Sequence, residues 1–253
     1  MLDRLRGRPV GGVPVDLDEP AVAQDIAPPA GRDGDIAGFA TWVSDVVAAR
    51  PEVRVWQITN EANVPGSPDT DGSAIDPLGA LIEGVKSAAA AKAPSQLVGF
   101  NWFYRLDPVS DAQFWSTLGT RGGPPFRAAL DYAGVDIYAG TYVPPLFAVD
   151  DEAEFRRALE YVRRDLMPLA GLGESVPIYV QETGYPTLDP ALRTESRQAD
   201  ALRGYIRATE GFNVALLQWF QLADSRSTLN DGWGLLRADY SPKPAFDVMR
   251  AGR

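Results

Sequence analysis

The stretch Val53-Arg-Val-Trp-Gln-Ile-Thr-Asn-Glu-Ala-Asn63 changes character halfway along its length. Its first part, Val53–Ile58, is mostly apolar, as a buried strand of a parallel sheet requires. The residues that follow, 59–63, are mostly polar. In sheets of parallel strands, side chains at the carboxyl ends of the strands form the functional site. The stretch therefore predicts either a site at a strand end or an ordinary strand exit whose Asn and Glu are only solvated.

The rest of the chain repeats this pattern of an apolar run, a polar tip and an amphipathic segment. The pattern predicts strands at 97–100, 133–138, 176–180 and 214–220, and helices at 35–49, from 77, at 109–118, 151–169 and 194–209, and from 241. Asp35, Asp76 and Thr194 are placed to cap three of these helices. Alternating strands and helices predict an α/β fold with a parallel sheet. Five units in residues 53–253 give the spacing of a (β/α)8 TIM barrel.

The residues before this region do not supply the remaining strands of a barrel. Proline and glycine alternate through residues 1–34, which we expect to be irregular, with at most one short strand at 13–17. The prediction is an incomplete TIM-barrel domain at 35–253, two or three strands short of closure. A barrel left open in this way has sheet edges that another chain would cover.

The composition excludes several kinds of chemistry. The chain has 253 residues, a formal charge of −10, no cysteine and no histidine. The negative charge argues against nucleic acid and an anionic membrane surface as partners. Without cysteine or histidine there is no disulfide, no Ser-His-Asp triad and no ordinary zinc site. No glycine loop that would cradle a phosphate precedes a lysine, so we expect no cofactor and no metal.

Targeting signals are not evident in the sequence. No apolar run approaches the length of a membrane span, and no apolar segment follows the basic residues near Met1. We therefore expect no signal peptide in the chain as it stands, and secretion if a longer N-terminus precedes it.

Two glutamates occupy equivalent positions in the repeating pattern. Glu61 and Glu182 each follow a polar residue at a strand end, three units apart. In a barrel their side chains would converge over the axis from the same rim. Cleavage of a glycosidic bond needs two carboxyl groups, one protonated and one ionised, and neither role needs His, Cys or a metal. The sequence therefore predicts that the two carboxylates face each other about 5 Å apart.

Four segments resemble the clan A glycoside hydrolases, which are retaining (β/α)8-barrel enzymes. They are Trp56–Asn63, Ile178–Thr187, Leu217–Phe220 and Gly234–Phe246. The second has the Glu-Thr-Gly-Tyr-Pro form of β-glucanases and β-galactanases. The resemblance implies that the predicted strands are strands four to eight of the barrel. It also implies that Glu61 is the acid/base, that Glu182 is the nucleophile, and that a β-linked glycan is cleaved with retention.

The resemblance also implies roles for neighbouring residues. Asn60 would bind the sugar 2-hydroxyl, Tyr138 would hold the nucleophile with Tyr142 as the reserve, and Trp219 would floor the sugar subsite. The clan also places an arginine from strand two beside the nucleophile, and nothing before Val53 matches that strand.

Aromatic residues at strand ends can stack on sugar rings. An aromatic plane matches the apolar face of a pyranose. Trp102 lies at such a position, and the alternative for it, as for Trp219, is ordinary packing in the core.

A second function stays open at this point. A barrel fragment descended from such an enzyme could bind carbohydrate, or serve as a structural module, without catalysis. The missing strands favour this alternative. The two glutamates oppose it, because a binding protein does not need both.

Overall fold

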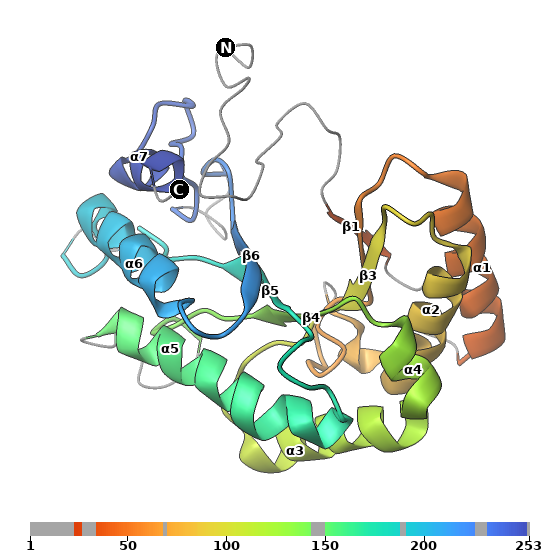
Figure 1. Cartoon of the computed structure of the whole chain (residues 1–253). Coiled ribbons are helices and arrows are strands. Elements are labelled where there is room, and N and C mark those ends of the chain that lie inside the picture. Colours follow the sequence, from red (N-terminus) through yellow and green to blue (C-terminus); the bar gives the residue numbers. More distant parts are fainter. Residues whose placement is uncertain are drawn as a thin grey trace. The chain divides into compact units, whose positions relative to one another are not determined.

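The computed structural model describes residues 34–67, 70–142, 150–187, 191–225 and 232–251, and the backbone of 23–26. It contains six strands, whose order in the chain is also their order in the sheet. Helices follow the strands along the chain (Figure 1). The strands are β1 (Ala23–Ile26), β2 (Val55–Ile58), β3 (Leu97–Phe100), β4 (Tyr132–Asp136), β5 (Ile178–Thr183) and β6 (Val214–Trp219).

Seven α-helices alternate with these strands in the described residues. They are α1 (Ile36–Ala49), α2 (Pro77–Ala91), α3 (Pro108–Thr117), α4 (Gly123–Ala129), α5 (Asp151–Tyr161), α6 (Glu195–Ala208) and α7 (Pro244–Ala251). Shorter turns are the 3-10 helices η3 (Asp71–Ser73) and η6 (Met167–Ala170) and the π-helices η4 (Leu118–Gly122) and η5 (Val162–Leu166). None of the described helices has the length and apolar character that would let it cross a membrane.

The predicted helix caps are confirmed. The side chain of Asp35 accepts a hydrogen bond from the N–H of Gly38 at 2.8 Å. Asp76 accepts one from Gly79 at 2.9 Å, and Thr194 accepts one from Arg197 at 3.2 Å. Each cap satisfies an N–H group that the first turn of a helix leaves without a partner.

The chain forms two compact units. The N-terminal unit consists of Glu19–Asp136 and Tyr161–Tyr179. The C-terminal unit consists of the described residues within Ile137–Glu160 and Val180–Arg253. The boundary between the units therefore falls within β5, whose last four residues belong to the C-terminal unit.

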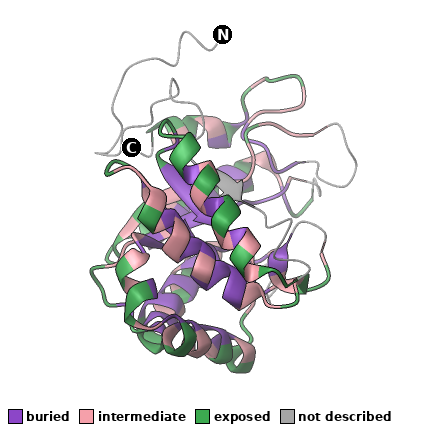
Figure 2. Cartoon of the chain, turned by 90° about the vertical axis from the view of Figure 1, so that its right-hand side faces the viewer, coloured by how far each residue is buried: buried purple, intermediate pink, exposed green. Residues whose placement is uncertain are grey.

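Parallel strand pairs form the centre of the N-terminal unit. Val55 of β2 is in register with Leu97 of β3, and Gly99 of β3 with Tyr132 of β4. All four residues of β2 are buried, as its apolar sequence predicts. Helices α1 and α2 pack side by side in this unit (Figure 1). Buried stripes along the helices alternate with exposed ones (Figure 2), so each helix covers the core with one face.

Strand β1 corrects the expectation that residues 1–34 are irregular. Its sequence, Ala-Gln-Asp-Ile, carries no strong strand signal, and prolines flank it. It forms because β2 offers a free edge, with Ala23 in register with Val55 and Ile26 with Ile58. Backbone pairing here overrides a weak local preference. The short strand expected at 13–17 lies outside the described residues.

Two helices differ in extent or in type from the helices that the sequence predicts. The single short helix expected at 109–118 continues through η4 into α4, which ends at Ala129. The helix expected at 151–169 is divided into α5, η5 and η6, and Pro168 stands in the first turn of η6. Proline lacks the N–H that an uninterrupted α-helix needs, so the helix changes type there.

Each unit has an aromatic core. In the N-terminal unit Trp102 packs against Trp115 with ring centroids 5.8 Å apart, and Phe100 also contacts Trp115. In the C-terminal unit Phe155 stacks on Tyr205 at 4.5 Å. Rings of this size bury large apolar areas, which is the main stabilising contribution in folds of this kind.

The carboxylate of Asp111 lies inside the N-terminal unit. Asp111 in the first turn of α3 is fully buried. Its Oδ2 accepts hydrogen bonds from the N–H of Asp107 at 3.0 Å and the hydroxyl of Tyr161 at 3.4 Å. The Nε of Arg105 lies 3.9 Å from its Oδ1, beyond hydrogen-bond range. Burial raises the pKa of Asp111 from 3.8 to about 6, because these partners do not fully replace water.

We expect Asp111→Asn to stabilise the protein in a pH-dependent way. The folded pKa of about 6 lies above the ordinary 3.8, so the proton on Asp111 stabilises the fold below pH 3.8, and this is lost as the pH rises through 6. Asparagine keeps an acceptor and carries no charge. The free energy of unfolding at pH 8 should therefore rise by about 2–3 kcal/mol, with the gain disappearing near pH 4. Urea unfolding at both pH values measures this.

The exposed residue Asp45 offers a matched control for this substitution. Asp45→Asn should change the stability by less than about 0.5 kcal/mol at either pH. A loss of stability in Asp111→Asn that is the same at pH 4 and pH 8 would contradict the assignment of a buried, destabilising charge.

Candidate active site

The polar end of β2 adopts an unusual backbone. Thr59 and Glu61 have φ angles of 64° and 44°, in the left-handed region that L-residues rarely occupy. Hydrogen bonds on either side hold this turn. The N–H of Asn60 donates to Asp71 Oδ2 at 2.7 Å, and the carbonyl of Asn60 accepts from the N–H of Asp71 at 2.8 Å. Such strain persists where surrounding contacts fix it, and it occurs often at functional sites.

The side chain of Asn101, just after β3, connects three strand ends. Its Oδ1 accepts a hydrogen bond from the N–H of Glu61 at 2.6 Å. Its Nδ2 donates to Asn60 Oδ1 at 3.0 Å and to Asp136 Oδ2 at 2.6 Å. Gln57 Nε2 also donates to Asn60 Oδ1, at 3.1 Å. Asn101 and Asp136 are fully buried, whereas Asn60 and Glu61 are half-buried. The buried side chain of Asn101 therefore fixes the positions of the two more exposed residues, Asn60 and Glu61.

Glu61 and Asp136 bring two carboxylates close together in the N-terminal unit. Oxygens of the two groups lie within 4.8 Å of one another. Ionised carboxylates at this distance repel each other, and the Asn101 donor to Asp136 offsets part of that repulsion. Carboxylate oxygens are also the ligands that hard cations such as Ca²⁺ and Mg²⁺ prefer.

Trp102 does not offer a ring face to a ligand in this structure. The sequence predicts a sugar-stacking role, whereas the side chain is fully buried. Its ring meets Tyr104 at 6.3 Å and Trp115 at 5.8 Å, both edge to face. Its Nε1 has no hydrogen-bond partner among the described residues. The packing alternative therefore describes Trp102, and we do not include it in the candidate site.

In the C-terminal unit, Glu182 lies near the end of β5. Its Oε2 accepts a hydrogen bond from the hydroxyl of Tyr138 at 2.6 Å, and its carbonyl accepts one from the N–H of Ile137 at 2.9 Å. Burial raises the pKa of Glu182 above its ordinary 4.5, and the hydrogen bond from Tyr138 opposes this by favouring the ionised form. Tyr138 thus contacts the carboxylate, as the resemblance implies.

Aromatic rings surround Tyr138. It meets Tyr142 at 5.3 Å and Trp233 at 5.4 Å, both edge to face, and Phe220 at 6.4 Å. Tyr142 stacks on Trp233 at 5.9 Å and remains 58% exposed, so one ring of this cluster is open to a ligand. Trp219, 8% exposed, donates its Nε1–H to the carbonyl of Trp233 at 2.9 Å.

Sequence reasoning missed the central role of Asn101. The signal was present, because Asn101 is the first polar residue after the apolar run of β3. The structure also places Trp233 in contact with Tyr138, Tyr142 and Trp219. Nothing in the local sequence indicates those contacts.

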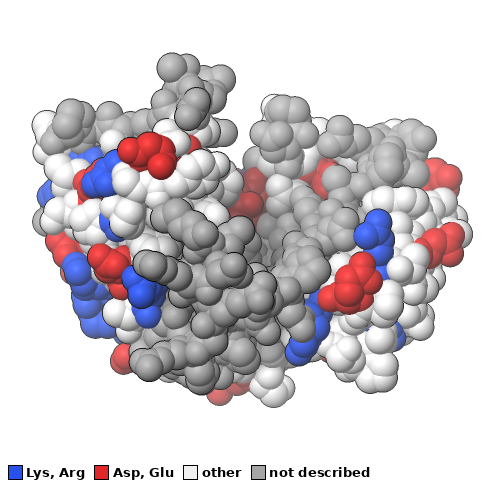
Figure 3. Space-filling model, turned by 90° about the horizontal axis from the view of Figure 1, so that it is seen from above, with Lys and Arg blue, Asp and Glu red and all other residues white. Residues whose placement is uncertain are grey.

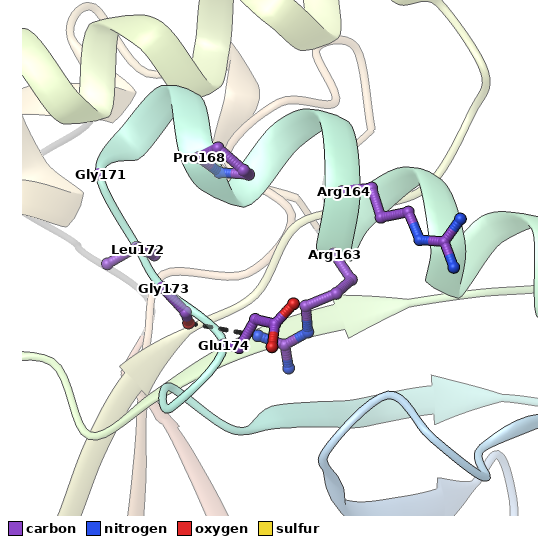
Figure 4. Close-up of a pocket in the computed structure, with 7 residues that line it drawn as sticks. All are labelled: Arg163, Arg164, Pro168, Gly171, Leu172, Gly173 and Glu174. Carbon is purple, nitrogen blue, oxygen red and sulfur yellow. Dashed lines mark hydrogen bonds between the residues drawn. The ribbon is translucent and has the colours of Figure 1, made fainter.

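A separate pocket of about 470 Å³ lies on the surface of the N-terminal unit (Figure 4). Arg163 reaches across it to the carbonyl of Gly173 at 3.4 Å, and Arg164 extends away from Glu174. The lining residues precede β5, and therefore lie at its amino end. Sites in barrels form at the carboxyl ends of strands, so this pocket is not the candidate active site.

Charged residues are mixed on the surface. On the face shown in Figure 3, lysine and arginine lie beside aspartate and glutamate. The described residues also include ion pairs between opposite charges, such as Arg121–Asp76 at 2.6 Å and Arg207–Glu152 at 2.5 Å. The described surface in this view therefore does not have the single basic stripe that a nucleic-acid site requires.

No protein-family model matches the chain, and no curated protein matches it. Solved structures do resemble it. The β-glucuronidase of Ruminococcus gnavus aligns with 85% of this chain and 35% of its own, with a TM-score of 0.56 and 16% identity. A thermostable mutant of a xylanase (Xyn10A) from Cellvibrio japonicus aligns over 85% of this chain and 70% of its own, with a TM-score of 0.58 and 18% identity.

Xylanase 10B from Thermotoga petrophila RKU-1, in complex with xylobiose, covers 84% of this chain and 64% of its own, with a TM-score of 0.56 and 16% identity. Another glucuronidase structure contains D-glucuronic acid. The chain spans about a third of the length of the glucuronidase. At these identities the likeness shows the fold alone, which is a TIM barrel, present here in part. The predicted fold class is confirmed.

We expect Asn101→Asp to destabilise the N-terminal unit. The substitution keeps the shape of the side chain but replaces the Nδ2 donor with an oxygen, which would face Asp136 Oδ2 and Asn60 Oδ1. The free energy of unfolding should fall by at least about 3 kcal/mol at pH 7, because buried acceptors lose their donor and like charges meet. Part of the loss should return at pH 5, where a proton restores a donor. Chemical denaturation at both pH values measures this.

The exposed Asn213 provides the same substitution away from the network. Asn213→Asp should change the stability by less than about 0.5 kcal/mol. If Asn101→Asp lost no more stability than this control, Asn101 would not be the residue that holds the strand ends together.

Proposed function

We propose that the protein is a retaining glycoside hydrolase that cleaves a β-linked glycan by double displacement. In this proposal Glu182 is the nucleophile, Glu61 is the acid/base, and their carboxylates face each other about 5 Å apart across the sugar. The barrel fold and the two strand-end glutamates support it. The observation that carries it is the hydrogen bond of 2.6 Å from Tyr138 to Glu182, because it is the contact that a nucleophilic carboxylate needs to remain ionised when buried.

In the first step, the ionised carboxylate of Glu182 attacks the anomeric carbon. The bond from that carbon to the leaving oxygen breaks, and the carboxyl proton of Glu61 passes to that oxygen. In the second step, Glu61 takes a proton from water, whose oxygen attacks the anomeric carbon and releases Glu182. Two inversions at one carbon give net retention.

Neighbouring side chains would bind the sugar. Asn60 is half-buried beside Glu61 and would hydrogen-bond the 2-hydroxyl, a contact that strengthens in the transition state. Tyr142 offers an exposed ring for stacking, and Trp219 would form the floor of the subsite. The substrate class we propose is therefore a neutral or weakly acidic β-glycan, to be sought among glucans, galactans, mannans, xylans and glucuronides.

We expect azide rescue to distinguish the two glutamates. With an aryl β-glycoside, Glu182→Ala should lower kcat/KM by more than about 10³-fold and Glu61→Ala by about 10²–10⁴-fold. Azide fills the space of the lost carboxylate in Glu182→Ala and attacks once, giving the α-glycosyl azide. In Glu61→Ala it attacks the glycosyl-enzyme, giving the β-glycosyl azide. Proton NMR of the products measures the anomeric configuration.

The outcomes separate the proposal from its alternative. Full activity in both Glu61→Gln and Glu182→Gln, or an inverted product from the wild-type protein, would contradict the assignment. Binding of these glycans without any turnover by the 253-residue chain would instead favour the non-catalytic carbohydrate-binding alternative.

We expect Tyr138→Phe to move the acidic limb of the pH–rate profile to higher pH. The hydrogen bond from Tyr138 lowers the pKa of Glu182, so its removal raises that pKa. Because Glu182 acts in its ionised form, activity should then be lost at a higher pH as the solution is acidified, and kcat/KM at low pH should fall by about 10–100-fold. Rates at pH 4–8 measure this.

The exposed residue Tyr240 offers the matched control. Tyr240→Phe should leave the profile unchanged. An unshifted acidic limb in Tyr138→Phe would show that Tyr138 does not hold the nucleophile.

A further inference from the structure

Lys243, which directly precedes α7, is a cation buried in the C-terminal unit. The side chain is 1% exposed. Its ammonium group donates to Asp224 Oδ1 at 2.8 Å, to Thr187 Oγ1 at 3.0 Å and to the carbonyl of Gly232 at 3.1 Å. All three protons of the ammonium therefore have an acceptor. The acceptors come from three segments, after β5, after β6 and just before Trp233, so one cation links three loops.

The same network fixes the backbone on both sides of Trp233. The carbonyl of Gly232 accepts from Lys243, and also from the N–H of Thr187 at 2.9 Å. On the other side, the N–H of Gly234 donates to Asp224 Oδ1 at 2.8 Å. Gly232 has a φ of 86°, which favours glycine, and a Cβ on Gly234 would lie 2.2 Å from the N of Asp224. The segment is therefore shaped for this contact.

Trp233 connects the Lys243 network to the candidate site through contacts with Trp219 and Tyr138. Its carbonyl accepts the Nε1–H of Trp219 at 2.9 Å. Its ring meets Tyr138 edge to face at 5.4 Å, and Tyr138 donates to Glu182. A shift of the Trp233 backbone would therefore move the proposed floor of the sugar subsite and the residue that holds the proposed nucleophile.

We propose that Lys243 is a positioning residue for the reaction, acting through Trp233 on Trp219 and on the Tyr138–Glu182 pair. This inference rests on the proposed function, because it assigns a catalytic consequence to the network. It differs from a purely structural role in one respect. If Lys243 acts through Trp233, the effect on turnover must depend on the Trp233 ring, whereas an effect on stability need not.

The test compares Lys243→Met, Trp233→Ala and the double variant on an aryl β-glycoside, at a temperature where all are folded. Lys243→Met should lower kcat/KM by about 10–100-fold in the wild-type background and by less than about 3-fold in the Trp233→Ala background. Lys243→Arg, which keeps the charge, should recover part of the loss. Lys86→Met, at a surface ion pair with Glu83, is the control and should leave kcat/KM unchanged.

A second measurement does not depend on turnover. Hydrogen exchange at the N–H of Gly234 should accelerate by more than about 10-fold in Lys243→Met, because Asp224 loses the cation that holds it. If the wild-type protein cleaves no glycoside, the proposed function fails, while unchanged exchange at Gly234 would overturn the assigned network. If Lys243→Met does not fold, Thr187→Val replaces it in the test. This variant removes only one of the three acceptors of Lys243, so it should change kcat/KM and the exchange rate in the same direction but by less.

Equal losses of kcat/KM in the two backgrounds would overturn the proposal, because Lys243 would then act independently of Trp233. A lower melting temperature with unchanged kcat/KM would also overturn it, since that is the result of a purely structural role. A loss confined to the background that contains Trp233, with partial recovery in Lys243→Arg, supports it.

Discussion

The amide of Asn101 is the contact on which the polar end of the N-terminal unit depends. Parallel strands deliver their carboxyl ends to one edge of a sheet, and β2, β3 and β4 each end in polar groups there. Those groups need partners when they are buried. Asn101 supplies a donor to Asp136 and an acceptor to the N–H of Glu61 from a single rigid side chain. A carboxylate of the same size would lack the donor, and a hydrophobic residue would lack both.

In the C-terminal unit a carboxylate also needs a hydrogen-bond donor, and here a phenol rather than an amide supplies it. Glu182 is a carboxylate whose burial raises its pKa, and the phenol of Tyr138 supplies the opposing hydrogen bond. Tyr138 can do this because aromatic neighbours fix its ring on several sides. Burial and the hydrogen bond from Tyr138 therefore shift the pKa of Glu182 in opposite directions.

Much of the fold follows from local sequence signals. The Asp and Thr caps and the apolar run of β2 locate elements because their chemistry acts within a few residues. Strand β1 could not be predicted in this way, since its pairing with Val55–Ile58 compensates for a poor local sequence. For the candidate site, the repeating pattern placed Glu182 at a strand end, and the resemblance implied a contact with Tyr138 or Tyr142, of which the structure shows the first. The burial of Trp102 was not predictable, because it depends on packing against Trp115, and the fold of the chain through α3 brings that residue into contact.

Within each unit, the polar residues described above fall into a buried set and a more exposed set. Asn101, Asp136, Tyr138 and Lys243 are all less than 5% exposed, and each side chain makes at least one hydrogen bond to another protein group. Asn60, Glu61 and Tyr142 are more exposed. Burying a polar group costs free energy unless it is hydrogen-bonded. A buried group that is hydrogen-bonded holds its partners in a defined geometry. The buried set is held by contacts within the protein, whereas the other set is accessible from outside. Preorganisation of this kind lets a site act without reordering its own side chains when a ligand binds.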